Sequence, residues 1–310
     1  MSSMRGGASA TGKEQGQWQG RTDGTQWMHQ TLIVLFRYVN LRFVYLFMAV
    51  FVVPFYMLFF HQGYISIYHY FRRRLHYGPV KAFCKVYQNH YRFGQIILDR
   101  FAVYAGQQFH TDVEGGEHFD RLQASEQGII VLSSHVGNYE LAGYAFRSRQ
   151  KRFNALVYAG EAAVVMENRN RMLSRNNMRM IPVGNDLSHI FLANEALANG
   201  EIVSIPADRI FGSPRFIECQ FFGTKARFPL GPFAMALQRG VPVVAMMVMK
   251  EDTHRYKIYV REVKADEGLN TRREQAASLA QHFARELELV LRNYPEQWFN
   301  YYDFWQQDGE

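Results

Sequence analysis

Residues 128–140 read GIIVLSSHVGNYE and combine a strand with the polar groups that follow it. The apolar run at 129–132 has the length and β-branched content of a buried parallel strand. Two serines interrupt the run, so His135 is expected just beyond the carboxyl end of the strand. In open α/β sheets, ligands bind at that edge. The stretch therefore predicts an imidazole at the mouth of a parallel sheet.

A carboxylate follows this histidine within the same stretch. Glu140 can hold one imidazole nitrogen of His135 protonated, which leaves the other nitrogen free to take a proton from a hydroxyl. An offset of five residues along a continuous helix would put the two side chains on different faces, so the pair needs a turn, which Gly137 can supply. The alternative is a chance pairing, because a chain with eleven histidines contains about one such spacing at random.

The composition limits the class of protein. With 310 residues, of which 48% are hydrophobic, the chain can bury a substantial core. Its two cysteines are too few for a disulfide framework and fit a reducing compartment. The net charge of +7 favours an anionic membrane surface, an acidic carrier protein or nucleic acid as partner. The sequence has no zinc-finger or RNA-binding signature, so we expect no nucleic-acid partner.

The first 75 residues form two compositional segments. Residues 1–25 are rich in Gly, Ser, Gln and Thr and are expected to be a disordered tail. Residues 26–75 are expected to be a helical membrane anchor, because residues 43–60 carry no charge and are long enough to cross the hydrocarbon core. Basic residues stand on both sides of this run, so the orientation rule does not decide its topology. A single span, a re-entrant or surface-lying helix pair, and a buried core hairpin remain alternatives.

Strands alternate with helices through residues 76–310, the expected catalytic domain. This alternation predicts an α/β fold with a mainly parallel central sheet flanked by helices. Helices are expected at residues 79–104, 230–239 and 271–293, and strands at 154–158, 202–205, 241–249 and 256–260, the last as a half-exposed edge strand. Asp208 and Arg209 then stand where His135 stands, just beyond the carboxyl end of a strand. An aspartate at such a point is more often a turn former than a catalytic group.

The string SSHVGNYE at residues 133–140 resembles the signature block of the bacterial lipid A biosynthesis acyltransferase family, within the lysophospholipid and glycerolipid acyltransferase superfamily. The family block reads H-[FV]-G-N-[WY]-E, which residues 135–140 match. The resemblance continues through PADRIFG at 206–212, FFGTKARFPLGPFAMALQRGVPVV at 221–244 and YPEQWF at 294–299. It covers most of residues 125–305.

This resemblance implies acyl transfer at a membrane surface. His135 would deprotonate a hydroxyl or amine of a lipid or glycolipid acceptor, which attacks the thioester of acyl carrier protein or acyl-CoA, and Glu140 would orient His135. The oxyanion would be held by backbone amides near Gly137 or by Arg175. The residues expected to bind substrate are Gly137, Asn138, Arg175, Asp208 and Arg209. No metal and no cofactor are expected.

The resemblance also implies a location and leaves two alternatives for the chemistry. We expect the bacterial inner membrane, with the catalytic domain on its cytoplasmic face. An acyl-enzyme on Ser134 is an alternative to direct transfer, although neighbours along a strand point to opposite faces. A catalytically silent membrane scaffold that binds an acyl carrier protein is an alternative of another class.

The expected acceptor departs from that of the lipid A enzymes. After P-E-Q-W those enzymes typically carry H-R-R-F, whereas residues 299–305 read FNYYDFW here. The arginines suited to a phosphorylated glucosamine are therefore missing. This segment resembles more closely the acyltransferase-like proteins associated with aryl polyene and flexirubin-type pigments. We expect an acceptor other than a phosphorylated disaccharide, with a lipid A acyltransferase proper as the alternative.

Overall fold

The computed structural model describes residues 31, 33–59, 62–141, 151–158, 177–184, 186–210 and 215–305. Within these ranges seven strands form one sheet in the order β1-β9-β8-β2-β5-β3-β4. All neighbouring strands are parallel except β8 and β9, which run antiparallel. The strands are β1 (His110–Glu114), β2 (Ile129–Ser133), β3 (Phe153–Tyr158), β4 (Met178–Val183), β5 (Ile202–Pro206), β8 (Val243–Lys250) and β9 (Arg255–Glu262). The predicted α/β class with a mainly parallel sheet is confirmed.

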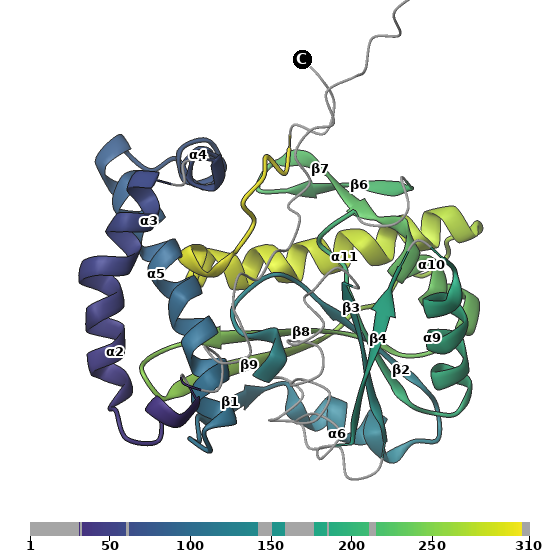
Figure 1. The fold of residues 1–310 in the computed structure, drawn as a ribbon. Helices are drawn as coiled ribbons and strands as arrows, with labels where there is room; N and C mark the ends of the chain where they lie inside the picture. Colours follow the sequence, from purple (N-terminus) through teal and green to yellow (C-terminus); the bar gives the residue numbers. More distant parts are fainter. Residues whose placement is uncertain are drawn as a thin grey trace, which may run out of the picture.

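Helices and a hairpin surround this sheet (Figure 1). The helices are α5 (Pro79–Tyr104), α6 (Gly116–Ala124), α9 (Ser188–Ala198), α10 (Leu230–Arg239) and α11 (Arg272–Asn293). A separate antiparallel hairpin consists of β6 (Phe216–Phe221) and β7 (Thr224–Pro229). Alternate side chains of each central strand enter different cores: Val244 and Met246 of β8 join the core closed by α6, whereas Ala245 and Met247 join the core closed by α10 and α11. Burial on both faces explains the unbroken apolar runs in the sequence.

Two helices lie where the sequence predicts them, whereas one predicted edge strand lies elsewhere in the sheet. Helix α5 has the expected limits, and α11 begins next to the expected residue 271, where Thr271 and Glu274 form a capping box. The strand expected at 256–260 as an edge lies inside the sheet, between β1 and β8. On that side of the sheet the edge strand is β1, whose sequence HTDVE has no apolar run because most of its side chains face solvent.

An apolar helix packs along one side of α5 (Figure 1). It consists of α2 (Leu41–Phe47), a π-helical turn (Met48–Val52) and α3 (Val53–Phe59), and α4 (Gln62–His69) follows. Its buried residues are Leu41, Tyr45, Met48 and Val53. The interval of five between the last two reflects the extra residue of the π turn, which also accommodates the missing N–H of Pro54. In the described part of the chain, this is the helix long and apolar enough to cross a membrane.

A buried ionic cluster fixes α5 between this apolar helix and the sheet. The Nζ atom of Lys250 lies 2.5 Å from Oδ2 of Asp99, and both side chains are fully buried. The hydroxyls of Tyr45 and Tyr256 donate hydrogen bonds to the same carboxylate. Burial raises the pKa of Asp99 and lowers the pKa of Lys250, and in each case the partner acts in the opposite sense. The cluster therefore ties together α2, α5, β8 and β9.

We expect Lys250→Met to lower the free energy of unfolding by about 3–5 kcal/mol, because it leaves the Asp99 carboxyl buried without its cation. The double variant Lys250→Met/Asp99→Asn should regain most of that loss, since the amide oxygen still accepts from the tyrosine hydroxyls. Urea unfolding in mild detergent measures both. A double variant as unstable as the single one would show that the cluster is not an electrostatic unit.

Candidate active site

His135 and Asp208 follow two neighbouring parallel strands. The register pairs Ser133 of β2 with Pro206 of β5, and the N–H of Ala207 donates to the carbonyl of Ser133 at 2.8 Å. Each site residue comes two positions after the end of its strand. Because the two strands end at the same level, their following residues meet at the carboxyl edge of the sheet. The structure thus brings together two of the residues singled out in the sequence.

Asp208 holds His135 by two hydrogen bonds. The Nδ1 atom of the ring lies 2.8 Å from Oδ1, and the backbone N–H of His135 donates to Oδ2, also at 2.8 Å. The Asp208 side chain is 1% exposed, whereas the His135 side chain is 27% exposed. An ionised carboxylate only accepts, so Nδ1 carries the proton of this bond. Nε2 is therefore the nitrogen left to exchange a proton with a substrate.

The electrostatic environment favours a neutral imidazole beside an ionised carboxylate. Burial lowers the pKa of His135 below the ordinary value of 6.5, against the attraction of Asp208 and with the help of the positive Arg209. Burial alone would raise the pKa of Asp208, but His135 and Arg209 outweigh it and hold that pKa below its usual range. Near neutral pH the ring is thus in the protonation state that a general base requires.

The predicted partnership of Glu140 with His135 is replaced by another. Oε2 of Glu140 lies 2.8 Å from Nε of Arg100 on α5, in a mostly buried ion pair. The Nδ1 atom of an imidazole has one in-plane position for a hydrogen-bond partner, and Asp208 fills it. Glu140 therefore anchors the residues after the turn to α5, and the orienting carboxylate comes from β5.

Gly137 and Asn138 fix the turn that carries the histidine. Gly137 has φ +49°, and a Cβ atom there would lie 1.9 Å from the carbonyl oxygen of Val248, so no other residue fits. The N–H of Gly137 donates to the carbonyl of Gln297 at 2.9 Å, and the N–H of Asn138 donates to the carbonyl of Val248 at 2.7 Å. These two amides are used by the fold. Of the backbone amides near Gly137 that were expected to hold an oxyanion, these two already have partners in the fold.

The buried cluster on α5 reaches the same turn. The side-chain amide of Asn138 donates to the hydroxyl of Tyr256 at 3.3 Å, and that hydroxyl donates to Asp99. Asn138 is itself buried. Sequence reasoning missed Asp99 and Lys250, because a charged pair in the core leaves no pattern that differs from a solvated helix face. Their contacts make them positioning residues for the turn.

The C-terminal segment lies against the turn from the other side. The N–H of Phe299 donates to the carbonyl of His135 at 2.9 Å, and Arg209 donates to the carbonyl of Phe299 at 2.6 Å. The guanidinium of Arg209 lies 5.8 Å from the ring centroid of Tyr302. Arg209 thus joins the two segments that border His135, and its role in substrate binding stays a prediction.

Most of the aromatic rings in this segment are core residues. Trp298 and Phe304 are buried, and Trp305 stacks on Phe221 of the hairpin with centroids 5.9 Å apart. Tyr302 is the ring whose surroundings include both Arg209 and Asp208. Trp298 and Trp305 therefore pack into the core, whereas Tyr302 lies beside Arg209 and Asp208.

Two further sequence predictions concern Arg175 and Ser134. Arg175 lies outside the described residues. Ser134 is 3% exposed, and its buried hydroxyl has no hydrogen-bond partner within the described part of the chain. A nucleophile must reach both a base and a substrate. The burial of this hydroxyl disfavours the alternative with an acyl-enzyme on Ser134. Among the described residues, no group of three or more His, Cys, Asp or Glu side chains is placed to hold a metal ion.

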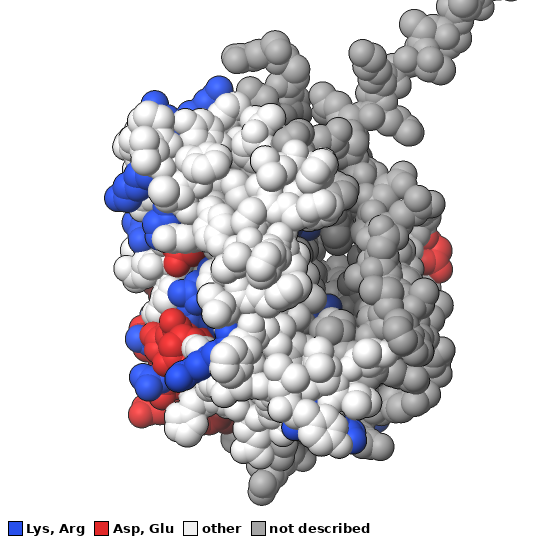
Figure 2. All heavy atoms as spheres, turned by 60° about the vertical axis from the view of Figure 1, so that its left-hand side comes forward, with Lys and Arg blue, Asp and Glu red and all other residues white. Residues whose placement is uncertain are grey.

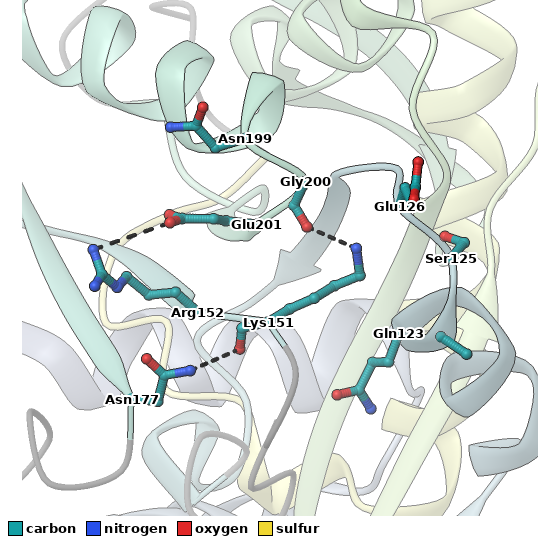
Figure 3. Close-up of a pocket in the computed structure, with 10 residues that line it drawn as sticks. Gln123, Ser125, Glu126, Lys151, Arg152, Asn177, Asn199, Gly200 and Glu201 are labelled. Carbon is teal, nitrogen blue, oxygen red and sulfur yellow. Dashed lines mark hydrogen bonds and ion pairs between the residues drawn. The ribbon is translucent and has the colours of Figure 1, made fainter.

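A cavity of about 540 Å³ lies at the opposite edge of the sheet (Figure 3). Its lining includes Lys151 and Arg152 just before β3, and Gly200 and Glu201 just before β5. Lys151 is largely buried and donates to the carbonyls of Gln127 and Gly200 at 2.8 and 2.7 Å. The polar residues that line the cavity form hydrogen bonds with one another at the amino ends of the strands. It is therefore separate from the edge that carries His135.

Comparison with known proteins places this arrangement in a family. The family described as bacterial lipid A biosynthesis acyltransferase matches residues 90–307. Phosphatidylinositol mannoside acyltransferases from two strains of Mycobacterium tuberculosis are 23% identical to the chain over 133 residues. That stretch is 43% of this chain and 42% of each relative, so the chain matches less than half the length of these curated relatives.

The family match extends over more than two thirds of the chain. It contains the strand that ends two residues before His135, the strand that ends two residues before Asp208, and the segment after Tyr294 that borders both residues. The chain belongs to the bacterial lipid A biosynthesis acyltransferase family.

Proposed function

We propose that the chain transfers a fatty acyl group from the thioester of acyl carrier protein or acyl-CoA to a hydroxyl or amine of a lipid or glycolipid, with His135 as the general base and Asp208 as the residue that orients it. The observation that carries this proposal is the pair of 2.8 Å hydrogen bonds that the Asp208 carboxylate accepts from the ring and the backbone of His135. The family match supports the reaction class. A catalytically silent scaffold would have no use for an aligned base with one nitrogen left open.

The proposed reaction is a direct displacement. Nε2 of His135 takes the proton of the acceptor as its oxygen or nitrogen attacks the thioester carbonyl. The tetrahedral intermediate collapses, the carbon–sulfur bond breaks, and the imidazolium returns its proton to the leaving thiolate. Asp208 stabilises that imidazolium and keeps the ring in one tautomer. Because the amides of Gly137 and Asn138 are used by the fold, Arg175 is our proposed donor to the oxyanion.

For the acceptor we propose a lipid without a phosphorylated disaccharide, with an aryl polyene-type lipid as the narrower form of the proposal. Residues 299–305 contribute aromatic rings and the carboxylate of Asp303 where the lipid A enzymes carry arginines. A carboxylate beside a phosphate repels it, whereas a guanidinium binds it in a bidentate manner. The second candidate is a lipid A precursor, which the family match and the cation of Arg209 favour. The proposed location is the cytoplasmic face of the bacterial inner membrane.

We expect Asp208→Asn to lower kcat for acyl transfer by about 10²- to 10⁴-fold, because the ring loses the acceptor that fixes its tautomer and stabilises its charged form. His135→Ala should abolish transfer. Glu140→Gln should cost less than Asp208→Asn, since Glu140 pairs with Arg100. Initial rates with radiolabelled acyl thioester and circular dichroism of each variant provide the measurement.

The matched control is Glu218→Gln on the exposed hairpin, where the carboxylate pairs only with Lys225 among the described residues. It should retain the rate of the unmodified protein. If Glu140→Gln reduced kcat as far as His135→Ala while Asp208→Asn did not, the assignment of the orienting carboxylate would be reversed.

The pH dependence of kcat/KM should report the lowered pKa of His135. The base works in its neutral form, so the rate falls as the pH drops through that pKa, and the midpoint should lie below 6.5. Arg209→Gln removes a positive charge that lowers this pKa, so it should move the acid limb to higher pH. If the variant stayed active and the acid limb of its pH profile did not move, the titrating group would not be His135.

A competition assay tests the acceptor. Purified protein receives acyl carrier protein charged with one fatty acid, together with lipid A precursor, neutral glycolipid and an aryl polyene lipid at equal concentration. We expect the phosphorylated disaccharide to be the poorest acceptor. Its preferential acylation would identify a lipid A acyltransferase proper, and Asp303 would then have to face away from the acceptor.

A further inference from the structure

The apolar helix of residues 41–59 leaves one whole side uncovered. Its exposed large apolar residues are between 47% and 70% exposed. They are Phe43, Leu46, Phe47, Val50, Phe51, Val52, Phe55, Tyr56, Leu58 and Phe59. Figure 2 shows a broad surface of uncharged side chains on this face of the molecule, with Lys and Arg along its margin. A continuous apolar surface of this kind marks a binding surface for a membrane or another protein.

The opposite side of the same helix is fastened to α5 along its length. The hydroxyl of Tyr87 donates to the carbonyl of Ala49 at 2.7 Å, and the rings of Tyr56 and His90 lie 5.8 Å apart. Tyr45, one end of the contact, bonds to Asp99. Tyr45 contacts Asp99, Met48 lies against Gly94 and Tyr56 lies against His90, so the two helices lie antiparallel. The orientation of the apolar helix relative to α5 is therefore fixed by the fold of the catalytic domain.

Close approach makes this contact hard to give up. A Cβ atom at Gly94 would lie 2.3 Å from the sulfur of Met48, so the glycine allows the two helices to touch. Asp99 would lose the hydroxyl of Tyr45 as a donor if the helices separated. An unpaired group in that cluster is costly because its surroundings exclude water. The apolar helix therefore cannot leave α5 without disturbing the positioning cluster of the active site.

A transmembrane orientation conflicts with this attachment. If the helix crossed the bilayer, α5 would lie in the hydrocarbon with its polar residues, among them Arg92, Arg100 and Asn89. A charged side chain at the bilayer centre is strongly unfavourable. The ion pair of Arg100 with Glu140 and the catalytic turn beside it would be carried in as well. Only a helix that lies flat on the membrane buries its apolar face without carrying the polar residues of α5 into the hydrocarbon.

We propose that residues 41–59 lie in the plane of one leaflet of an anionic phospholipid bilayer, with the uncovered face among the acyl chains and both ends of the helix on the same side. Charge complementarity supports a lipid occupant: Arg37 and Arg42 are exposed at one end of the helix, and Arg72 and Arg73 are exposed beyond α4. Cations beside an apolar face are the arrangement that binds anionic surfaces. The orientation holds α5 and the turn of His135 next to the lipid phase. The inference builds on the proposed activity at a membrane.

Depth measurements decide between a flat and a crossing helix. In the full chain with Cys84→Ala and Cys219→Ala, single cysteines replace Phe43, Phe47, Phe51, Phe55 or Phe59, and each is labelled with a nitroxide. The proteins bind to vesicles of phosphatidylcholine and phosphatidylglycerol, and the accessibility of each label to oxygen and to a polar nickel complex gives its depth. A flat helix places all five labels at similar depth. A crossing helix separates the first and last labels by about 24 Å along the membrane normal.

Vesicle flotation supplies an independent result. Phe47→Glu/Phe51→Glu should weaken binding by at least about tenfold, because two exposed apolar side chains no longer enter the acyl chains. The control is Phe191→Glu on α9, a phenylalanine even more exposed than Phe47 and Phe51 and far from the apolar helix (Figure 1). A depth gradient along the helix, or unchanged flotation of the double variant, overturns the proposal. Neither measurement depends on acyl transfer, so a failure of this proposal can be distinguished from a failure of the proposed reaction.

Discussion

The close approach of the Gly137 backbone to β8 is the constraint on which the candidate site depends. The carbonyl of Val248 accepts from the N–H of Asn138, and no side chain fits at the preceding position. This contact sets the path of the chain between the end of β2 and the residues that follow. The histidine is consequently held on a turn whose backbone hydrogen bonds are satisfied by the sheet and by the C-terminal segment. Such a turn limits the motion of the base before any substrate arrives.

Two neighbouring residues of α5 connect this turn to the surface helix by different routes. Arg100 pairs with Glu140, and Asp99 reaches Asn138 through the hydroxyl of Tyr256. Asp99 also accepts from Tyr45 of the apolar helix. Helix α5 therefore links the helix that we place on the membrane with the residues that hold the base. The charge on Lys250 is part of this link, since it offsets the carboxylate on which both tyrosines converge.

The sequence predicted the helices and strands more accurately than it predicted which side chains contact one another. The apolar run before His135 and the capping box at Thr271 are local signals, so strand and helix followed from them directly. The carboxylate that holds the ring is 73 residues away from it and becomes a neighbour only because β5 pairs with β2. No local pattern reports strand order, so the sequence alone favours the nearer Glu140 as the partner of His135. Similarly, helix α5 exposes the apolar Phe83 and buries the polar Asn89 and Asp99, which apolar periodicity alone does not predict.

The separation of the site residues along the chain has a consequence for the order of synthesis. His135 leaves the ribosome long before Asp208, and residues 295–305, whose backbone bonds the turn at Gly137 and His135, come later still. A nascent chain that has formed only β2 and the turn carries an imidazole without its orienting acid and with unpaired backbone groups beside it. The site becomes complete only after the segment beyond α11 has been translated and has docked. An incomplete chain therefore lacks the arrangement on which the proposed reaction depends, even when its apolar N-terminal helix has already been made.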